Sequence, residues 1–559
     1  MPSLLHPLCW LPALLGSAHA ASPLNVLWST KEYGPDGPWS AVSTTIGDKY
    51  SVDLYPGDIG SSNVMQSQLC ENTTLSSTCY AERAGTVNIS AIDYPISWKN
   101  PSNWHSCSFS TDGGCRFSDF STVMSFGSSV PNVSMSAIWE AYETYPGGAQ
   151  YQPQVGTLSL GGPYPFYPTN GGTNIINWYL YNDSSIPSYS YGLHIGSVEP
   201  SVTRSLLLGG YDQNRVLGEV SAQSVVLNAA NSGALQIGLE DIGLGVASGG
   251  SPFNFTSKEG LFVQSDGVAR RSSVTADPTK PYLYLPKNSC DAIAAELPVS
   301  FNESLGLYFW NTSSSQYNDI VSSPTYLSFT FDKDSANNKN FTIKVPFQLL
   351  NLTLQEPLVS QNTSYFPCFP YDEDNANPIL GRAFLQAAFV GANFFQGTDN
   401  QGTWFLAQAP GPSLPATAVT TINPSDKTIQ GSSSSWEETW DGYWTPLSDS
   451  GSSKKSGGLS TGGKVGVGVG VGIAGAIIIA AVAAWAIVRR RRNNAAAMQT
   501  IPDDQTQQPL QPMQPMHTMQ PQQLAADPVR PAELSEAYKP VDKPPVEVPA
   551  QEHMRYELD

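Results

Sequence analysis

Residues 22–409 alternate short apolar runs with Gly, Pro, Asn and Ser. Runs such as Ser205–Leu208 and Tyr326–Phe331 have the length of β-strands. Helical periods are scarce, and Asp291–Leu297 and Ala383–Ala388 are among the few helix candidates. The pattern therefore predicts a mainly β domain, and because about 390 residues exceed one ordinary core, we expect two lobes.

A longer apolar run follows at Val465–Val488, which carries no charge and ends at Arg489–Arg492. A helix of this length reaches about 36 Å, whereas the hydrocarbon core of a bilayer is about 30 Å thick. A buried core helix is the alternative interpretation, but such helices are rarely both this long and free of charge. We predict a transmembrane helix at 465–488.

The two ends of the chain predict its orientation. Met1–Ala20 has an apolar middle and closes on Ala18-His19-Ala20, as secretory signal peptides do. Arg489–Arg492 favours a cytosolic position for the tail by the positive-inside rule. We expect a single-pass type I protein of the plasma membrane or a secretory-pathway membrane, and the tail argues against a lipid anchor.

The composition agrees with export. Charged residues make up 13% of the chain, against about 25% in typical domains, and the net charge of −19 argues against a nucleic-acid partner. All N-x-S/T sequons lie before residue 465, which predicts a glycoprotein. Their asparagines are Asn72, Asn88, Asn132, Asn182, Asn254, Asn302, Asn311, Asn340, Asn351 and Asn362.

Two further segments lack the pattern of a folded domain. Residues 410–463 are rich in Ser, Thr, Pro and Gly, which predicts a flexible stalk; the aromatic and acidic patch Trp436–Trp444 is either a binding motif or part of this spacer. Residues 489–559 are rich in Gln, Pro and Met and predict a disordered cytosolic tail. Its end, Met554–Asp559, is either a docking site for a cytosolic partner or an inert terminus.

Cysteine usage predicts disulfides. Six cysteines remain after the signal segment, an even number that in an oxidising compartment suggests three bridges, with fifteen possible pairings. They are Cys70, Cys79, Cys107, Cys115, Cys290 and Cys368. Short loops favour Cys70–Cys79 and Cys107–Cys115, which leaves Cys290–Cys368. No CxxC pair or Cys/His cluster suggests a metal site, and we expect no metal or cofactor.

The predicted exported part contains few histidines that could act in catalysis. Only His105 and His194 lie between the signal segment and residue 465. His194 stands between Leu193 and Ile195, so we interpret it as a packed strand residue. No phosphate-binding glycine loop opens a helix. Carboxylates are therefore the remaining candidates for catalytic groups.

Several segments resemble pepsin-like (family A1) aspartic proteases. Asp58-Ile59-Gly60-Ser61-Ser62-Asn63, which starts twelve residues after Ile46, is similar to the first active-site turn of that family, Asp-Thr-Gly-Ser-Ser-Asn. Further similar segments follow in the family's order: Gly156–Gly161, Ser205–Asp212, Ala234–Ile237, Pro378–Leu385 and Trp404–Ala407. The resemblance implies two β lobes, at about 22–210 and 211–409, with a cleft between them. It also implies a small disulfide loop at Cys70 and Cys79 and a second-lobe disulfide between Cys290 and Cys368.

The resemblance implies a catalytic dyad of Asp58 and Asp277, but both turns depart from the family pattern. In the family, two carboxylates share a proton and activate a water molecule. The hydroxyl residue after each Asp braces the opposite turn, and the following Gly lets the backbone approach and donate. Pro278 and Ile59 provide no hydroxyl, and Thr279 adds a Cβ where the family has Gly.

Three functions are consistent with these residues. The first is a membrane-anchored acid endopeptidase that acts on surface or secreted polypeptides. The second is a non-catalytic pseudo-protease receptor or cell-wall sensor, which binds a peptide or cell-wall ligand in its cleft and signals through the tail. The third is a structural surface glycoprotein. The architecture resembles the anchored surface aspartic proteases of fungi, although these commonly use a lipid anchor.

Overall fold

The computed structural model describes residues 21–58, 61–92, 113–161, 174–226, 233–334, 339–371, 377–394 and 401–448. The predicted signal segment (1–20), membrane span (465–488) and tail (489–559) lie outside these residues. Within the described residues, no helix is both long and apolar enough to cross a membrane. The described residues up to 448 all fall in one compact unit, Met1–Ser453.

The first lobe is built on an eight-stranded sheet. Successive side chains of a strand point to opposite faces, and in β3 both faces bury apolar side chains: Trp39 and Ala41 on one face, Val42 and Ile46 on the other. The order is β2 (Trp28–Tyr33), β3 (Trp39–Ile46), β4 (Tyr50–Asp58), β9 (Gly156–Ser159), β5 (Ser62–Met65), β7 (Ser129–Thr144) and β6 (Gly113–Ser125), and β8 (Gln150–Tyr151) pairs with β7.

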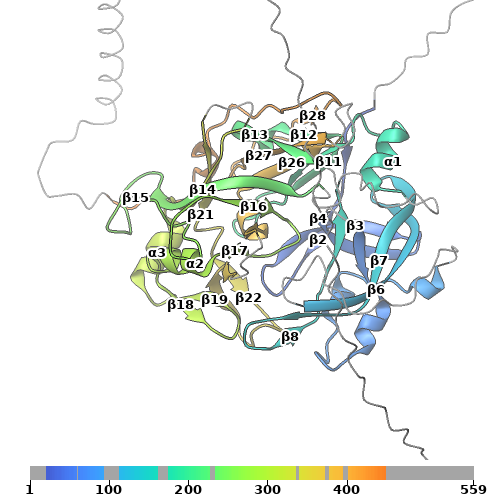
Figure 1. Ribbon diagram of the computed structural model, residues 1–559, viewed down its shortest axis with the longest axis horizontal. Helices are drawn as coiled ribbons and strands as arrows, with labels where there is room; N and C mark the ends of the chain where they lie inside the picture. Colours follow the sequence, from blue (N-terminus) through green and yellow to red (C-terminus); the bar gives the residue numbers. More distant parts are fainter. Residues whose placement is uncertain are drawn as a thin grey trace, which may run out of the picture. The chain divides into compact units, whose positions relative to one another are not determined.

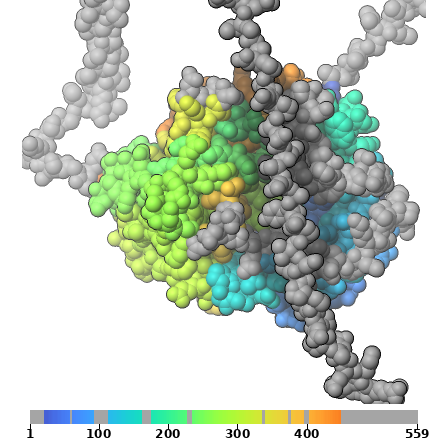
Figure 2. Space-filling model, viewed as in Figure 1, coloured from blue at the N-terminus to red at the C-terminus, as the bar shows by residue number. Residues whose placement is uncertain are grey.

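The second lobe carries another eight-stranded sheet. Its order is β21 (Phe341–Pro346), β20 (Thr325–Phe331), β14 (Leu235–Val246), β16 (Ser272–Ala276), β25 (Ile379–Leu380), β17 (Leu283–Leu285) and β24 (Cys368–Pro370), and β15 (Ser257–Lys258) pairs with β14. A smaller sheet has the order β18 (Val299–Asn302), β19 (Leu307–Trp310), β23 (Thr363–Phe366) and β22 (Leu352–Leu354). In Figures 1 and 2 this lobe is green and yellow, beside the blue and cyan first lobe.

A third sheet contains strands from both halves of the chain. Its order is β1 (Leu24–Asn25), β11 (Ser205–Leu208), β10 (Ser190–His194), β26 (Ala388–Asn393), β27 (Gln401–Gln408) and β13 (Leu217–Val226). The two halves join where β10 pairs antiparallel with β26, from Ser190 opposite Asn393 to Leu193 opposite Val390. Backbone hydrogen bonds therefore run across this junction between the lobes.

Helices are short and few among the described residues. They are α1 (Ile176–Asn182), α2 (Lys287–Ala294), α3 (Ser315–Ser322) and α4 (Arg382–Leu385), with single 3-10 turns η1 (Ser67–Glu71), η2 (Tyr80–Arg83), η3 (Ile89–Ala91), η4 (Gln213–Arg215) and η5 (Glu438–Trp440). The prediction of a mainly β protein is confirmed. The two predicted helices exist with shifted bounds: α2 starts earlier than Asp291, and α4 ends before Ala388 because β26 begins there.

The prediction of a flexible stalk from residue 410 is wrong over residues 410–448, which we call the C-terminal strap. In the strap, β28 (Val419–Thr421) pairs antiparallel with β12 (Gly210–Asp212). The side-chain amide of Asn393 donates to the backbone carbonyls of Asn423, Pro424 and Asp426. Farther on, the N–H of Gly250 donates to the carbonyl of Leu447 over 2.8 Å.

The aromatic patch of the strap explains why it folds. Trp440 is 1% exposed and stacks on Trp444 with ring centroids 4.9 Å apart, and Trp436 packs edge-on against Tyr326 of β20. The ammonium of Lys344 lies 4.9 Å from the centre of a Trp436 ring. Large aromatic side chains bury enough apolar surface to offset the entropy lost when a polar segment becomes ordered.

We predict that replacing Trp440 with Ala lowers the free energy of unfolding by about 3–5 kcal/mol, the usual cost of removing a large buried aromatic side chain. Equilibrium denaturation measures the effect. Tyr443→Ala is the control, because Tyr443 is 44% exposed and surface changes usually stay within about 0.5 kcal/mol. Equal, small effects of both substitutions would mean that the strap contributes nothing to stability.

Candidate functional site

The two predicted catalytic turns occupy corresponding positions in the two lobes. In the first lobe, β4 ends at Asp58 and runs parallel to β9, which is antiparallel to β5. In the second lobe, β16 leads directly into Asp277 and runs parallel to β25, which is antiparallel to β17. The same three-strand arrangement thus carries each aspartate at the end of its first strand.

The backbones of the two turns are in contact. Gly57, which precedes Asp58, has a φ of +116°, and a Cβ placed on it would lie 2.0 Å from Cγ of Pro278. No other residue fits here, because a side chain would overlap the proline ring. The end of β4 therefore packs directly on the second turn. Ile59 and Gly60 lie outside the described residues.

Asp277 is held by its own turn. Its Oδ1 accepts hydrogen bonds from the backbone N–H of Thr279 at 2.9 Å and from the Thr279 hydroxyl at 2.6 Å. The Cβ of Thr279 thus does not prevent the main-chain donation that the family obtains from Gly. Pro278 is buried and has neither a hydroxyl nor an N–H to offer to the opposite turn. Thr279 thus donates to Asp277 within the turn, and Pro278 provides no hydroxyl brace.

Arg382 supports the second turn from behind. Its Nη1 donates to the carbonyls of Pro278 at 3.2 Å and Thr279 at 2.8 Å. The guanidinium carbon lies 4.2 Å from the ring centre of Tyr55 and 5.2 Å from that of Trp39, both in the first lobe. Only 5% of Arg382 is exposed. Carbonyl dipoles and aromatic faces therefore stabilise this buried cation.

Asp36 is a second buried charged group beside Arg382. Its Oδ1 accepts a hydrogen bond from Trp39 Nε1 at 2.9 Å, and its backbone carbonyl accepts one from the Tyr365 hydroxyl at 2.6 Å. Burial raises the pKa of Asp36, while the charge of Arg382 and the Trp39 hydrogen bond act in the opposite direction. The stability that this group contributes is fully present below the unfolded pKa, near 3.8, and is lost as pH rises through the higher folded pKa.

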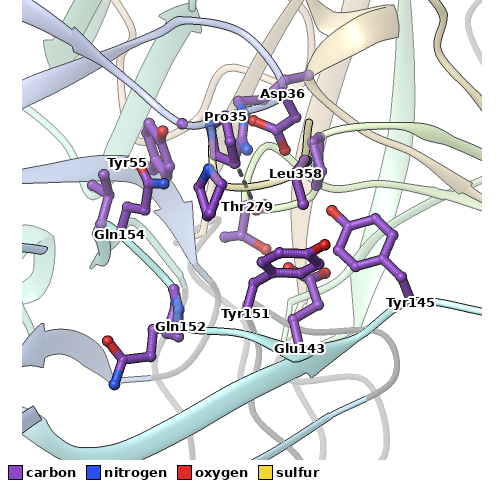
Figure 3. A pocket seen from close by; sticks show the side chains of 16 residues that line it. Pro35, Asp36, Tyr55, Glu143, Tyr145, Tyr151, Gln152, Gln154, Thr279 and Leu358 are labelled. Atoms are coloured by element: carbon purple, nitrogen blue, oxygen red, sulfur yellow. Dashed lines mark hydrogen bonds between the residues drawn. The ribbon is translucent and has the colours of Figure 1, made fainter. Parts of the chain in front are cut away.

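These residues line a cavity with both polar and apolar walls, to which both lobes contribute. Its volume is about 60 Å³, and Asp36, Tyr55, Gln154, Thr279 and Arg382 are among its walls. In Figure 3, Asp36 and Tyr55 lie at one end and Glu143 and Tyr151 at the other. Nearby, the hydroxyls of Tyr145 and Tyr282 join the lobes through a hydrogen bond of 2.9 Å. The cavity lies directly beside the turn that carries Asp277.

Sequence reasoning missed both Asp36 and Arg382. Arg382 stands as a single charge in the apolar segment Pro378–Leu385, which was a usable signal, because a cation in a buried run must find partners. Asp36 stands among Gly and Pro, as an ordinary turn residue does, and offers no such signal.

The disulfide predictions are confirmed as far as the described residues extend. Cys70 pairs with Cys79 and Cys290 with Cys368. Cys115 is also disulfide-bonded, and its predicted partner, Cys107, lies outside the described residues. One group in the described part of the chain has metal-like spacing, Cys70, Cys79 and Glu82, but its two cysteines are consumed by their disulfide.

The remaining predicted residues have simple positions. His194 is a fully buried residue of β10, as expected, and its ring Nε2 lies 3.1 Å from the Gln386 carbonyl. His105 lies outside the described residues. None of the ten sequon asparagines is buried; Asn72, Asn302 and Asn351 are half-buried and the other seven are exposed.

A comparison with protein-family models agrees with the resemblance seen in the sequence. Residues 130–401 match the family model described as eukaryotic aspartyl protease. This range includes Asp277 and begins after Asp58. The crystal structure of an aspartic proteinase from Irpex lacteus aligns with a TM-score of 0.42 and 14% identity, over 69% of this chain and 98% of that one. A search of curated proteins gives no match.

We predict that His194 makes the protein less stable in acid. Burial lowers the pKa of His194 to about 3, and the charge of Arg215 acts in the same direction. Below pH 6.5 the imidazole of His194 binds a proton in the unfolded chain but stays neutral in the folded protein. The free energy of unfolding therefore falls by up to about 1.4 kcal/mol per pH unit down to about pH 3.

Denaturant titrations at several pH values between 4 and 7 measure this slope, and NMR titration follows the ring of His194 in the folded protein. His194→Gln keeps a side-chain N–H for the Gln386 carbonyl and should reduce the slope. A ring that protonates near pH 6.5 without unfolding would contradict the prediction.

Proposed function

We propose that this protein, whose residues 130–401 match the model of the eukaryotic aspartyl protease family, binds polypeptides between its lobes without efficiently cleaving them. The observation that carries the proposal is the second turn, where Pro278 occupies the position of the bracing hydroxyl residue and packs against Gly57 of the first turn. The predicted signal segment and membrane span would display this domain outside the cytosol, at the plasma membrane or in the secretory pathway.

The loss of turnover follows from what an aspartate dyad requires. The two carboxylates must share one proton and hold a water molecule between them, so their relative position is critical. A displacement of about 1 Å in such a site can cost about a hundredfold in rate. Pro278 has no hydroxyl to donate across the turns, and the hydroxyl of Thr279 donates to Asp277. The brace that the family obtains from the residue directly after the second aspartate is therefore missing.

The capacity to bind is supported by features that do not depend on the dyad. The shared sheet and the Tyr145–Tyr282 hydrogen bond hold the lobes together. Polar groups of both lobes line the cavity beside the second turn. Concave sites with a few convergent polar groups are the usual places for ligands, and polypeptide is taken as the ligand class by analogy with the fold family. The tail at 489–559 is then the proposed contact with a cytosolic partner.

The second candidate function is an acid endopeptidase. The backbone donation from Thr279 to Asp277 favours it, because this contact survives the loss of Gly. The equivalent positions of Asp58 and Asp277 at their strand ends favour it too. The two candidates differ in turnover and share the binding of polypeptide.

We expect the purified protein to retain a denatured polypeptide on an affinity surface between about pH 3 and 6, the range in which carboxylate dyads act. We also expect it to cleave this polypeptide no faster than Asp277→Asn does. Gel analysis with and without pepstatin measures cleavage. Pepstatin-sensitive cleavage that disappears in Asp58→Asn and Asp277→Asn would establish the endopeptidase instead, and absence of retention would rule out the binding function.

We further expect that restoring the family's turns creates turnover. The triple variant Ile59→Thr/Pro278→Thr/Thr279→Gly supplies both hydroxyls and the glycine, and pepstatin-sensitive cleavage should rise at least about tenfold, at the lower end of what positioning contributes. Pro278→Ala is the matched control, because it removes the proline ring without adding a hydroxyl. Equal cleavage by the triple variant, the control and the unaltered protein would show that the missing braces do not limit catalysis.

A further inference from the structure

Two buried polar groups in the cavity lack hydrogen-bond partners among the described residues. Arg382 Nε and the Tyr55 hydroxyl oxygen are both inaccessible to solvent and unbonded there. The two residues are only 5% and 6% exposed. Buried donors are nearly always satisfied by protein, water or a ligand. Since both residues line the cavity, a polar group held in it could serve as a partner for both atoms.

The cavity has room for a small group. Its volume is about 60 Å³, and a second hollow of about 10 Å³ adjoins the same two side chains, Tyr55 and Arg382. One water needs about 10–15 Å³ on this measure. The larger hollow therefore accommodates about four heavy atoms, the size of one planar side-chain group. Asp36 Oδ1 and the Tyr55 hydroxyl oxygen both lie beside Gly34, at 2.7 and 3.0 Å from a Cβ placed on that residue.

The charges of the wall select the kind of group. Arg382 supplies a guanidinium and Asp36 a carboxyl group, whose ionised form the charge of Arg382 favours against the effect of burial. An anion would meet the carboxylate and a cation would meet the guanidinium, and each repulsion would be strong away from water. A neutral group that both donates and accepts suffers neither. A primary amide has this character, because its carbonyl accepts from Arg382 Nε–H and Tyr55 O–H while its NH₂ donates to Asp36.

We propose that the cavity binds the side-chain amide of a glutamine or asparagine in the polypeptide held between the lobes. This assignment rests on the proposed polypeptide-binding function and names the residue type that it selects. Arg382 connects the cavity to the second turn, since the same guanidinium donates to the carbonyls of Pro278 and Thr279. The selected side chain therefore lies beside Asp277.

Three small molecules of equal size test the cavity directly: acetamide, acetate and acetamidinium, which are neutral, anionic and cationic at pH 7. NMR titration of the full-length protein measures their dissociation constants. We expect acetamide to bind at least about fivefold more tightly than either ion, and Tyr55→Phe to weaken acetamide by about fivefold, the value of one neutral hydrogen bond. Thermal stability without ligand should not fall in Tyr55→Phe, because the hydroxyl has no partner among the described residues.

Tyr211→Phe is the matched control. Tyr211 is also buried, but its hydroxyl donates to the Gln430 carbonyl in the strap, and it does not line the cavity. It should leave the binding of acetamide unchanged. Equal binding of the three molecules, no binding of acetamide, or acetamide binding that survives Tyr55→Phe would overturn the assignment.

Matched peptides with glutamine or glutamate at one position separate the two proposals. Preference for the glutamine peptide, lost in Tyr55→Phe, supports both. Tyr55-dependent binding of acetamide without retention of any polypeptide would leave the amide site standing and remove the polypeptide-binding function. Retention of both peptides with equal affinity, together with equal binding of the three small molecules, would remove the amide site alone.

Discussion

The buried guanidinium of Arg382 is the interaction on which the centre of this protein depends. A cation out of water must be surrounded by carbonyls, aromatic faces or counter-charge. Here the two carbonyls come from the second turn and the two rings, Tyr55 and Trp39, come from the first lobe. One side chain therefore fixes the position of the second turn relative to the opposite lobe.

Around this centre, the two lobes repeat one strand arrangement with different turn chemistry. The parallel and antiparallel partners of β4 and β16 correspond, so the backbone framework of a dyad is intact. The side chains that would refine its geometry have been replaced. Pro278, which stands where the family has a hydroxyl residue, packs against Gly57 of the first turn. Under the proposed function, such a framework would position a polypeptide without efficiently moving its protons.

Local patterns in the sequence predicted the parts of the structure that local interactions determine. Strand-length apolar runs gave the β class, and short cysteine spacings gave Cys70–Cys79. The strap was missed because its Ser- and Pro-rich composition outweighed Trp436, Trp440 and Trp444, whose spacing of four residues predicts a common face. The electrostatic interaction between Asp36 and Arg382 joins positions far apart in the chain, and no local sequence pattern predicts it. The membrane span, signal segment and tail stay predictions.

The folded strap changes the mechanical connection between the domain and its predicted anchor. A disordered stalk over 410–463 would be a flexible linker that spans more than about 150 Å when fully extended, at about 3.3–3.6 Å per residue. The chain is instead attached to the second lobe as far as Leu447, through its hydrogen bond from Gly250. Only residues 449–463 remain before the predicted span, and they reach about 50 Å at most. The domain would then sample only ligands close to the bilayer, which concentrates its binding on neighbours in the same membrane or in the layer next to it.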